Sequence, residues 1–236
     1  MAHSDEMKKS PVPALPLKTN SLLRRMWEAE SYSLVLALII VSTLFEVIVP
    51  TDVVTRLVTV VLQGAMLLVA LRAARVRSQV LLAALLLLLL ALAISLVVTL
   101  SGADSPLVVP KVIAVILLAL TPLVIVSRIF RHLIVTVETI FGALSAYLLI
   151  GLFFAYTYAF VGSVAPPFFA SAGNYTIKDY LYFSFVTLTT LGFGDLVPRG
   201  DLPRMLVVVE AILGQLYLVT IVALLVSTYN RKQQPE

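Results

Sequence analysis

Apolar runs long enough to cross a lipid bilayer recur along most of the sequence. A membrane-spanning helix needs about 20 mainly apolar residues. The chain offers six such runs, at residues 31–49, 53–71, 79–98, 107–126, 135–160 and 202–229. Only 13% of its residues are charged, against about 25% in soluble domains. The sequence therefore predicts an all-α membrane protein with six transmembrane helices.

The first 30 residues and the residue types that the chain lacks exclude several classes of function. Residues 1–30 are polar, basic and rich in proline, without the apolar core of a signal peptide. They predict a cytoplasmic segment, with an interfacial helix near residues 22–27. The chain has no cysteine, so disulfides and thiolate metal sites are excluded. We find no catalytic dyad, phosphate-binding loop or basic nucleic-acid patch, so the sequence predicts neither an enzyme nor a nucleic-acid partner.

The lysines and arginines test the six-span topology, because short cytoplasmic loops carry an excess of them. If the N-terminus lies in the cytoplasm, twelve of the 17 basic residues fall on the inner side. The other five fall outside, at Arg56, Lys111, Lys178, Arg199 and Arg204. This asymmetry predicts a multi-pass protein of the cell membrane with both termini in the cytoplasm.

A shorter element lies between the fifth and sixth runs. Thr176 and Asp179 form a capping-box pattern for a helix that extends to about Thr189. At about 1.5 Å per residue such a helix is roughly 20 Å long, which reaches only partway into a bilayer. It is therefore predicted to be a re-entrant pore helix. The chain must then return as extended backbone, which at membrane depth has to be buried in protein or line water.

The returning segment reads TLTTLGFGD, residues 187–195. Its glycines permit positive φ, so that successive carbonyls can face one axis and replace the hydration shell of a cation. A threonine hydroxyl adds an inner ligand, and the aspartate brings negative charge to the outer mouth. The predicted site is an extended ion selectivity filter made of Thr190, Leu191, Gly192, Phe193 and Gly194, flanked by Thr189 and Asp195.

This segment resembles the filter of the tetrameric potassium-channel family, which reads Thr-Val-Gly-Tyr-Gly followed by Asp. The resemblance covers residues 135–229, including Pro198 and Gly214, and is to a six-span, bacterial-type channel. It implies a homotetramer with no cofactor beyond the permeant ion. It further implies that K⁺ is held by the Thr190 hydroxyl and by the backbone carbonyls of Thr190, Leu191, Gly192 and Phe193.

The last run carries the other predicted pore residues. Gly214 follows Asp195 by nineteen residues, the spacing of the hinge glycine in the simplest channels that the chain resembles; close helix packing is the alternative. In that register one helical face lines the cavity, with Gln215, Leu218, Val222 and Val226.

The resemblance also divides the chain. Residues 31–127 are expected to form a four-helix, sensor-like membrane domain, residues 128–229 the pore domain and residues 230–236 a short cytoplasmic tail. A voltage sensor needs several charges in the field, each contributing about 2.3 kcal/mol per 100 mV. The fourth run has no basic residue between Lys111 and Arg128. Strong voltage gating by this helix is therefore not expected.

Two carboxylates fall within apolar runs, where exposure to lipid would cost several kcal/mol. Glu210 is predicted to be either a structural hydrogen-bond partner of the pore helix or of a neighbouring subunit, or an intramembrane proton or ion sensor. Glu46 is expected to pair with Arg56 near the outer leaflet.

The sequence thus predicts a potassium-selective channel that conducts passively, in contact with membrane lipids. A non-selective cation channel of the same build, a secondary transporter and a non-conducting membrane subunit stay open as alternatives. The transporter is the weakest, because such folds usually carry two broken helices and this chain has one. The gating stimulus is left open between the filter, lipid or tension, and a regulatory subunit.

Overall fold

The computed structural model describes residues 19–49, 53–73, 76, 78–100, 112, 115–116, 118–123, 125 and 137–231. Regular structure in these residues is helical, apart from one isolated antiparallel bridge between Phe169 and Pro198. The predicted all-α class is confirmed.

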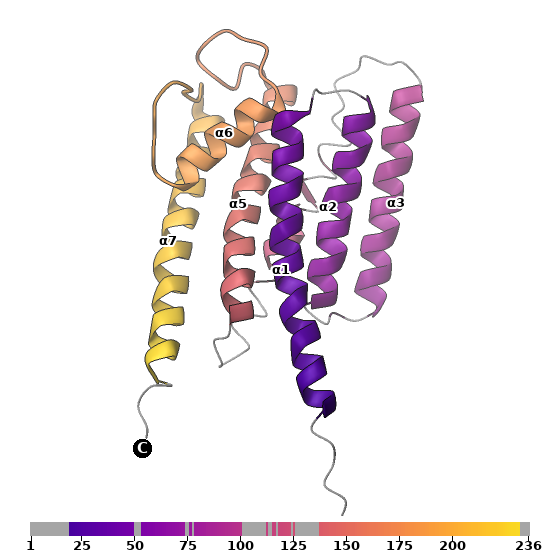
Figure 1. Ribbon diagram of the computed structural model, residues 1–236. Coiled ribbons are helices and arrows are strands. Elements are labelled where there is room, and N and C mark those ends of the chain that lie inside the picture. The colour runs from indigo at the N-terminus through magenta and orange to yellow at the C-terminus, as the bar shows by residue number, and fades with distance from the viewer. Residues whose placement is uncertain are drawn as a thin grey trace, which may run out of the picture.

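The helices stand mostly upright beside one another (Figure 1). In that view α7 lies at the left, followed by α5, α1, α2 and α3, while the short α6 is inclined between α5 and α7 and reaches only part of their length. Their bounds are α1 Thr19–Ile48, α2 Val53–Ala73, α3 Ser78–Leu100, α5 Val137–Val164, α6 Ile177–Leu188 and α7 Asp201–Arg231.

Two helical stretches are clearly long and apolar enough to cross a membrane. They are Thr139–Val164 in α5 and Asp201–Ile221 in α7. The apolar stretches Tyr32–Ile48, Leu57–Arg72 and Ser78–Ile94 each contain 17 residues or fewer. The described residues therefore contain two candidate spans, and they do not support the predicted count of six.

The first and fourth predicted runs differ from the structure in extent. Helix α1 begins at Thr19, so the short helix expected near residues 22–27 is the first part of α1 and not a separate element. The fourth run is described only in part; residues 118–123 are helical, and Leu118 and Ile125 are buried.

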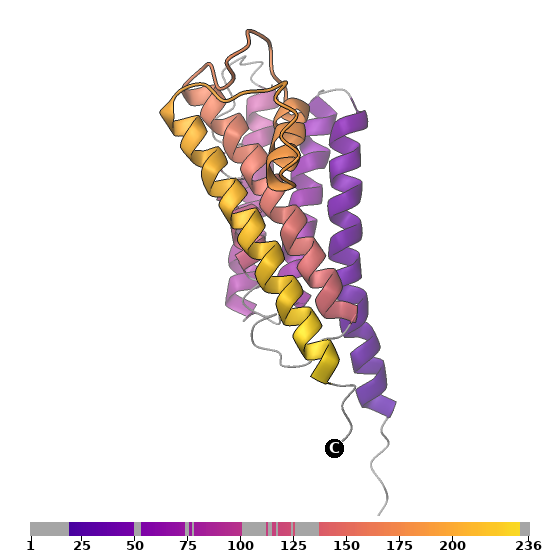
Figure 2. The ribbon, with the colours of Figure 1, turned by 90° about the vertical axis from the view of Figure 1, so that its left-hand side faces the viewer.

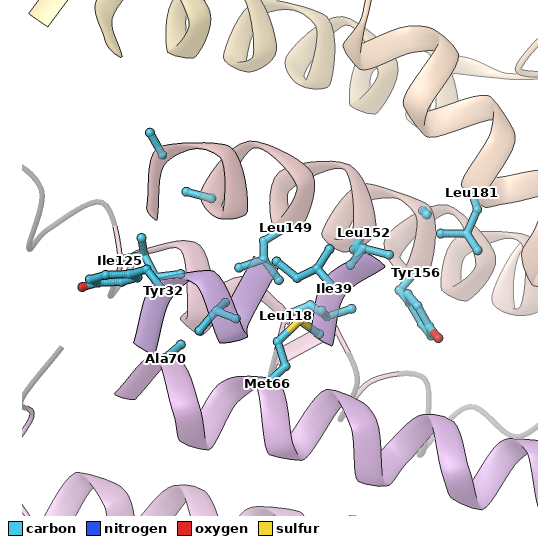
Figure 3. Packing of buried hydrophobic residues seen from close by; sticks show 14 of the residues in the cluster. Tyr32, Ile39, Met66, Ala70, Leu118, Ile125, Leu149, Leu152, Tyr156 and Leu181 are labelled. Carbon is cyan, nitrogen blue, oxygen red and sulfur yellow. The ribbon is translucent and has the colours of Figure 1, made fainter. Parts of the chain in front are cut away.

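The main core lies where α1 packs against α2 and α5. Buried positions on α1 recur every three or four residues and so form one face of the helix, at Tyr32, Val35, Ile39, Ser42 and Glu46. Figure 3 shows Ile39 between Met66 of α2 and Leu149 of α5. This packing attaches the N-terminal helices directly to α5.

A second, aromatic core holds α6 in place. The ring of Phe169, in the loop before α6, lies 5.3 Å from that of Tyr180 and 5.1 Å from that of Phe183. Tyr158 of α5 lies 5.0 Å from Phe168 and 5.6 Å from Phe183. Such aromatic pairs contribute about 0.5–1.5 kcal/mol each beyond the area they bury. They fix the loop and α6 to the outer half of α5.

The start of α6 confirms the predicted capping box. Thr176 is the N-cap residue with extended backbone. One carboxylate oxygen of Asp179 accepts hydrogen bonds from the Thr176 amide at 2.7 Å and from its hydroxyl at 2.9 Å. The helix ends at Leu188, within one residue of the predicted end.

Asp179→Ala should reduce the stability of the protein by about 1 kcal/mol, because the Thr176 amide loses its acceptor and the helix start loses a favourable negative charge. The apparent melting temperature in detergent measures the effect. Lys178→Ala, in the same turn, is the control and should change stability by less than about 0.5 kcal/mol. Equal losses in the two variants would contradict a role for the cap.

Candidate functional site

The candidate filter is the segment that connects α6 to α7. In Figure 1 the chain leaves the lower end of α6, partway down the bundle, and runs back up to the start of α7. The segment therefore begins at the carboxyl end of a helix, where the helix dipole supplies a partial negative charge of about half a unit. A cation at this position is stabilised.

The backbone of the segment alternates in sign of φ. Thr190, Gly192 and Gly194 have φ of 59°, 58° and 78°, while Leu191 and Phe193 between them do not take positive values. The positive φ predicted for the two glycines is found, and Thr190 joins them although a β-branched residue is rarely stable there. Alternation of this kind lets an extended chain turn successive carbonyls toward one side.

The inner part of the segment is anchored through its amides. The amides of Leu191 and Gly192 both donate to the Val186 carbonyl, at 3.0 and 3.4 Å, and the Thr190 amide donates to Thr187 at 2.9 Å. Among the described residues, no hydrogen bond reaches the carbonyls of the next residues in the segment. These unpaired acceptors belong to Thr190, Leu191, Gly192 and Phe193.

The outer part of the segment is tied to the loop before α6. The Ala170 amide donates to the Val197 carbonyl at 2.9 Å, and the Arg199 amide donates to the Phe168 carbonyl at 2.7 Å. These bonds flank the bridge to Pro198. Both ends of the segment are therefore held by the same part of the fold.

Two side chains of the segment meet Tyr182 on α6. The Phe193 ring is nearly parallel to the Tyr182 ring, with centroids 6.4 Å apart. The Tyr182 hydroxyl also faces the Asp195 carboxylate. Tyr182 thus contacts both the middle and the outer mouth of the segment.

An apolar surface runs from the segment down α7. Leu191 and Phe193 are 61% and 65% exposed. Helix α7 runs along the outside of the bundle in Figure 2, and the buried positions among its described side chains form a seam at Pro203, Glu210, Gly214 and Ile221. The rest of its circumference presents large apolar side chains, including Leu202, Met205, Val208, Ile212, Leu216 and Val219. Within the described part of the chain, no protein covers these side chains.

Glu210 lies in the seam and is fully buried. Its Oε2 atom accepts a hydrogen bond from the Tyr158 hydroxyl of α5 at 2.5 Å, and its Oε1 atom lies 2.5 Å from the Ser184 hydroxyl of α6. Ser184 also lies 2.7 Å from the Gly151 carbonyl of α5. These contacts agree with one of the two roles predicted for Glu210, that of a structural hydrogen-bond partner of the helix before the candidate filter.

Gly214 lies one turn below Glu210 and contacts the end of α6. A Cβ atom at this position would lie 2.7 Å from Cδ1 of Leu188 and 3.1 Å from its carbonyl oxygen. The same carbonyl accepts a hydrogen bond from the Tyr147 hydroxyl at 3.1 Å. Since α7 is unbroken through Gly214, the geometry is that of close packing, and its role as a hinge stays a prediction.

The predicted cavity residues are described only in part. The side chains of Gln215 and Leu218 are exposed, as a pore lining requires before assembly. The side chains of Val222 and Val226 lie outside the described residues.

Glu46 bonds to a tyrosine of α5, and its predicted pairing with Arg56 stays a prediction. The Tyr156 hydroxyl of α5 donates to its Oε1 atom, and Oε2 has no partner among the described residues. The side chain of Arg56 lies outside the described residues. Glu46 meets a tyrosine of α5 because it belongs to the face of α1 that packs on α5.

The sequence reading missed Tyr158, Tyr182 and Ser184 as partners of the site. One signal was present for Ser184. Ser184 and Leu188 are four residues apart, as are Glu210 and Gly214, so each pair occupies one helical face.

Comparison with known proteins bears on the region from α5 to α7. A family model described as "Ion channel" matches residues 142–231. The chain is 35% identical over 85 residues to the inward rectifier potassium channel Kirbac3.1 of Paramagnetospirillum magnetotacticum. The aligned residues make up 36% of this chain and 28% of that protein. The chain thus matches less than a third of the length of this relative. No solved structure matches the chain. Residues 142–231 are therefore similar to ion channels, and the matching relative is a potassium channel.

Proposed function

We propose that the protein is a potassium-selective channel, in which four copies of the chain conduct K⁺ passively through a filter of backbone carbonyls. One observation carries the proposal. The carbonyls of residues 190–193 have no hydrogen-bond partner among the described residues, in a segment whose φ alternates in sign. Backbone acceptors left unpaired at membrane depth are costly. A dehydrated cation is a ligand that would satisfy them.

Oxygen chemistry favours a monovalent cation at this site. Neutral carbonyls solvate K⁺ without binding it so tightly that it cannot leave. The Thr190 hydroxyl would complete the innermost ring of ligands, and Asp195 would attract cations at the outer mouth. The carboxyl end of α6 adds partial negative charge below the filter.

The need for several chains follows from the same segment. One chain supplies only a quarter of each carbonyl ring, and closed rotational symmetry generates the rest. Assembly around an axis beside the filter would cover Leu191, Phe193 and the apolar surface of α7. It would also bring Gln215, Leu218, Val222 and Val226 to a shared cavity, which supports a homotetramer.

The proposed setting is the cell membrane, with six spans and both termini in the cytoplasm. The exposed leucines of α3 are suited to contact lipid, at Leu82, Leu86, Leu89 and Leu90. Because α1 packs on α5, movements of the N-terminal helices would reach the pore within one chain. Lipid, tension or a regulatory subunit could act by this route, without gating charges in the fourth helix.

A non-selective cation channel is the second candidate, and one observation favours it. Phe193 meets α6 only through a ring contact with a centroid distance of 6.4 Å. A phenylalanine offers no hydroxyl for a hydrogen bond. The width of the filter is then fixed less firmly, which would weaken discrimination against Na⁺.

Potassium efflux from liposomes that contain the purified protein tests the proposal, with Na⁺ as the competing ion. We expect rapid K⁺ flux that excludes Na⁺, from a protein that cross-links as a tetramer. Equal fluxes of the two ions would establish the second candidate instead. Absence of flux at every pH, voltage and lipid composition would indicate a non-conducting subunit, and slow flux that saturates would indicate a transporter.

A further inference from the structure

The buried contacts of Glu210 fix how many protons it needs. Three close oxygen pairs link α5, α6 and α7 at this point: Tyr158 with Glu210, Ser184 with Glu210, and Ser184 with the Gly151 carbonyl. Each pair needs one proton between its two oxygens to be a hydrogen bond. Three protons are therefore required.

The hydroxyl groups supply only two of them. Tyrosine and serine each carry one hydroxyl proton, a backbone carbonyl carries none, and an ionised carboxylate carries none. With Glu210 ionised, Ser184 can donate either to Glu210 or to Gly151, and the other pair is left with two oxygens in contact and no proton. With Glu210 protonated, all three pairs are satisfied.

The surroundings agree with the neutral form. The described ionisable groups that face Glu210 are Tyr158 and Tyr147 of α5, and neither carries a positive charge. From α6 it is met by Ser184, while Lys178 and Asp179 lie at the outer end of that helix. On α7 itself the nearest basic residue is Arg204, almost two turns away. A buried carboxyl group without a cationic partner favours its neutral form.

We propose that Glu210 is a positioning residue that holds the filter only while it carries a proton. In this state Glu210 donates to the Ser184 hydroxyl, Ser184 donates to the Gly151 carbonyl, and Tyr158 donates to Glu210. Loss of the proton to water turns Ser184 toward the carboxylate and releases α6 from the Gly151 carbonyl. The proposal rests on the proposed conduction through residues 190–193.

The contact is placed to act on the filter. Ser184 lies two residues before Val186, whose carbonyl holds the amides of Leu191 and Gly192. One turn further along, Leu188 packs against Gly214. A displacement of α6 along this seam therefore moves the inner anchor of the filter.

The test is potassium flux as a function of pH in wild type and in Glu210→Gln. Glutamine is nearly isosteric, donates from its amide nitrogen to Ser184 and accepts from Tyr158, so it imitates the protonated acid at every pH. We expect the wild type to lose about tenfold of its selective flux as pH rises, the scale of one lost hydrogen bond. The variant should keep its flux and lose this pH dependence.

Two comparisons separate the proposal from other sources of pH dependence. Glu46→Gln changes another buried carboxyl group, bonded to the neighbouring Tyr156 but not to α6, and should keep the wild-type profile. A pH dependence that arises at other groups near the filter would persist in Glu210→Gln, because that variant leaves them intact. An unchanged profile in Glu210→Gln, or loss of selectivity in it at low pH, would overturn the proposal.

Infrared spectroscopy tests the protonation directly and does not need conduction. The difference spectrum between wild type and Glu210→Gln at neutral pH should contain the C=O band of one protonated carboxylic acid, shifted in D₂O. A carboxylate band in its place would overturn the proposal. If Glu210→Gln does not assemble, Ser184→Ala provides the same comparison, since the band should shift when its hydroxyl partner is lost. A wild type that does not conduct would refute the proposed function, while the infrared result would still decide the state of Glu210.

Discussion

Gly192→Asp is expected to reduce potassium flux to that of protein-free liposomes while the protein still folds and assembles. The backbone at Gly192 has φ of 58° with no atom within 4 Å of a Cβ placed there. The cost to a single chain is thus limited to the strain of a left-handed residue, about 1–2 kcal/mol. In the assembled filter, however, four aspartate side chains, each ending in a carboxylate, would surround the ion path. They would distort the carbonyl rings or hold a cation too tightly for it to leave.

Gly200→Asp is the matched control for this experiment. Gly200 has φ of 85° and open space around it, so the same substitution brings the same charge and a similar strain, but beyond the filter. It should retain selective flux. Conduction by Gly192→Asp, or equal loss in both variants, would show that residues 190–194 do not line the ion path.

Gly214→Ala is expected to destabilise the protein by about 1–3 kcal/mol, the usual cost of one added methyl group in a close contact. The new Cβ would approach Leu188 to 2.7 Å at Cδ1 and 3.1 Å at its carbonyl oxygen. The side chain can rotate away, but the carbonyl belongs to the end of α6 and can move only with it. Thermal unfolding in detergent gives the stability, and flux in liposomes gives the effect on conduction.

A double-mutant cycle with Leu188→Ala assigns the effect to this contact. Leu188→Ala alone should cost about 2–5 kcal/mol, because the side chain is buried. The double variant should be more stable than the sum of the single effects predicts, by about 0.5–3 kcal/mol. If the two changes in unfolding free energy simply add, Gly214 is required for a reason other than this contact. Bending of α7 at a hinge would then be the explanation to test.

The elements defined by local rules could be predicted from the sequence. Thr176 and Asp179 are three residues apart, so the cap of α6 depends on a pattern that a reader can see in the sequence. The extents of α5 and α7 follow from the length of their apolar runs. The glycines at 192 and 194 indicated where φ would be positive, because few other residues occupy that region.

The partners of the buried carboxylates could not be predicted in the same way. Glu46 lies 110 residues from Tyr156, and Glu210 lies 52 residues from Tyr158. Which tyrosine of α5 each one meets depends on the depth and rotation at which two helices pack. Apolar runs do not encode this, because almost every face of α5 is apolar. The positive φ of Thr190 was missed for a related reason. The surrounding structure imposes this φ, although a threonine by itself does not favour it.

The pairing of the filter at both ends limits how it can change shape. Its inner end bonds to the Val186 carbonyl, and at its outer end the Val197 carbonyl accepts a hydrogen bond from the Ala170 amide. These two anchors limit how far the chain between them can lengthen or shorten. In the proposed channel, a change in the shape of the filter would be a rotation of single peptide planes between residues 193 and 196, which reverses a carbonyl without moving the Cα atoms far. Such a rotation would be confined to the backbone of this segment and separate from any movement of α7.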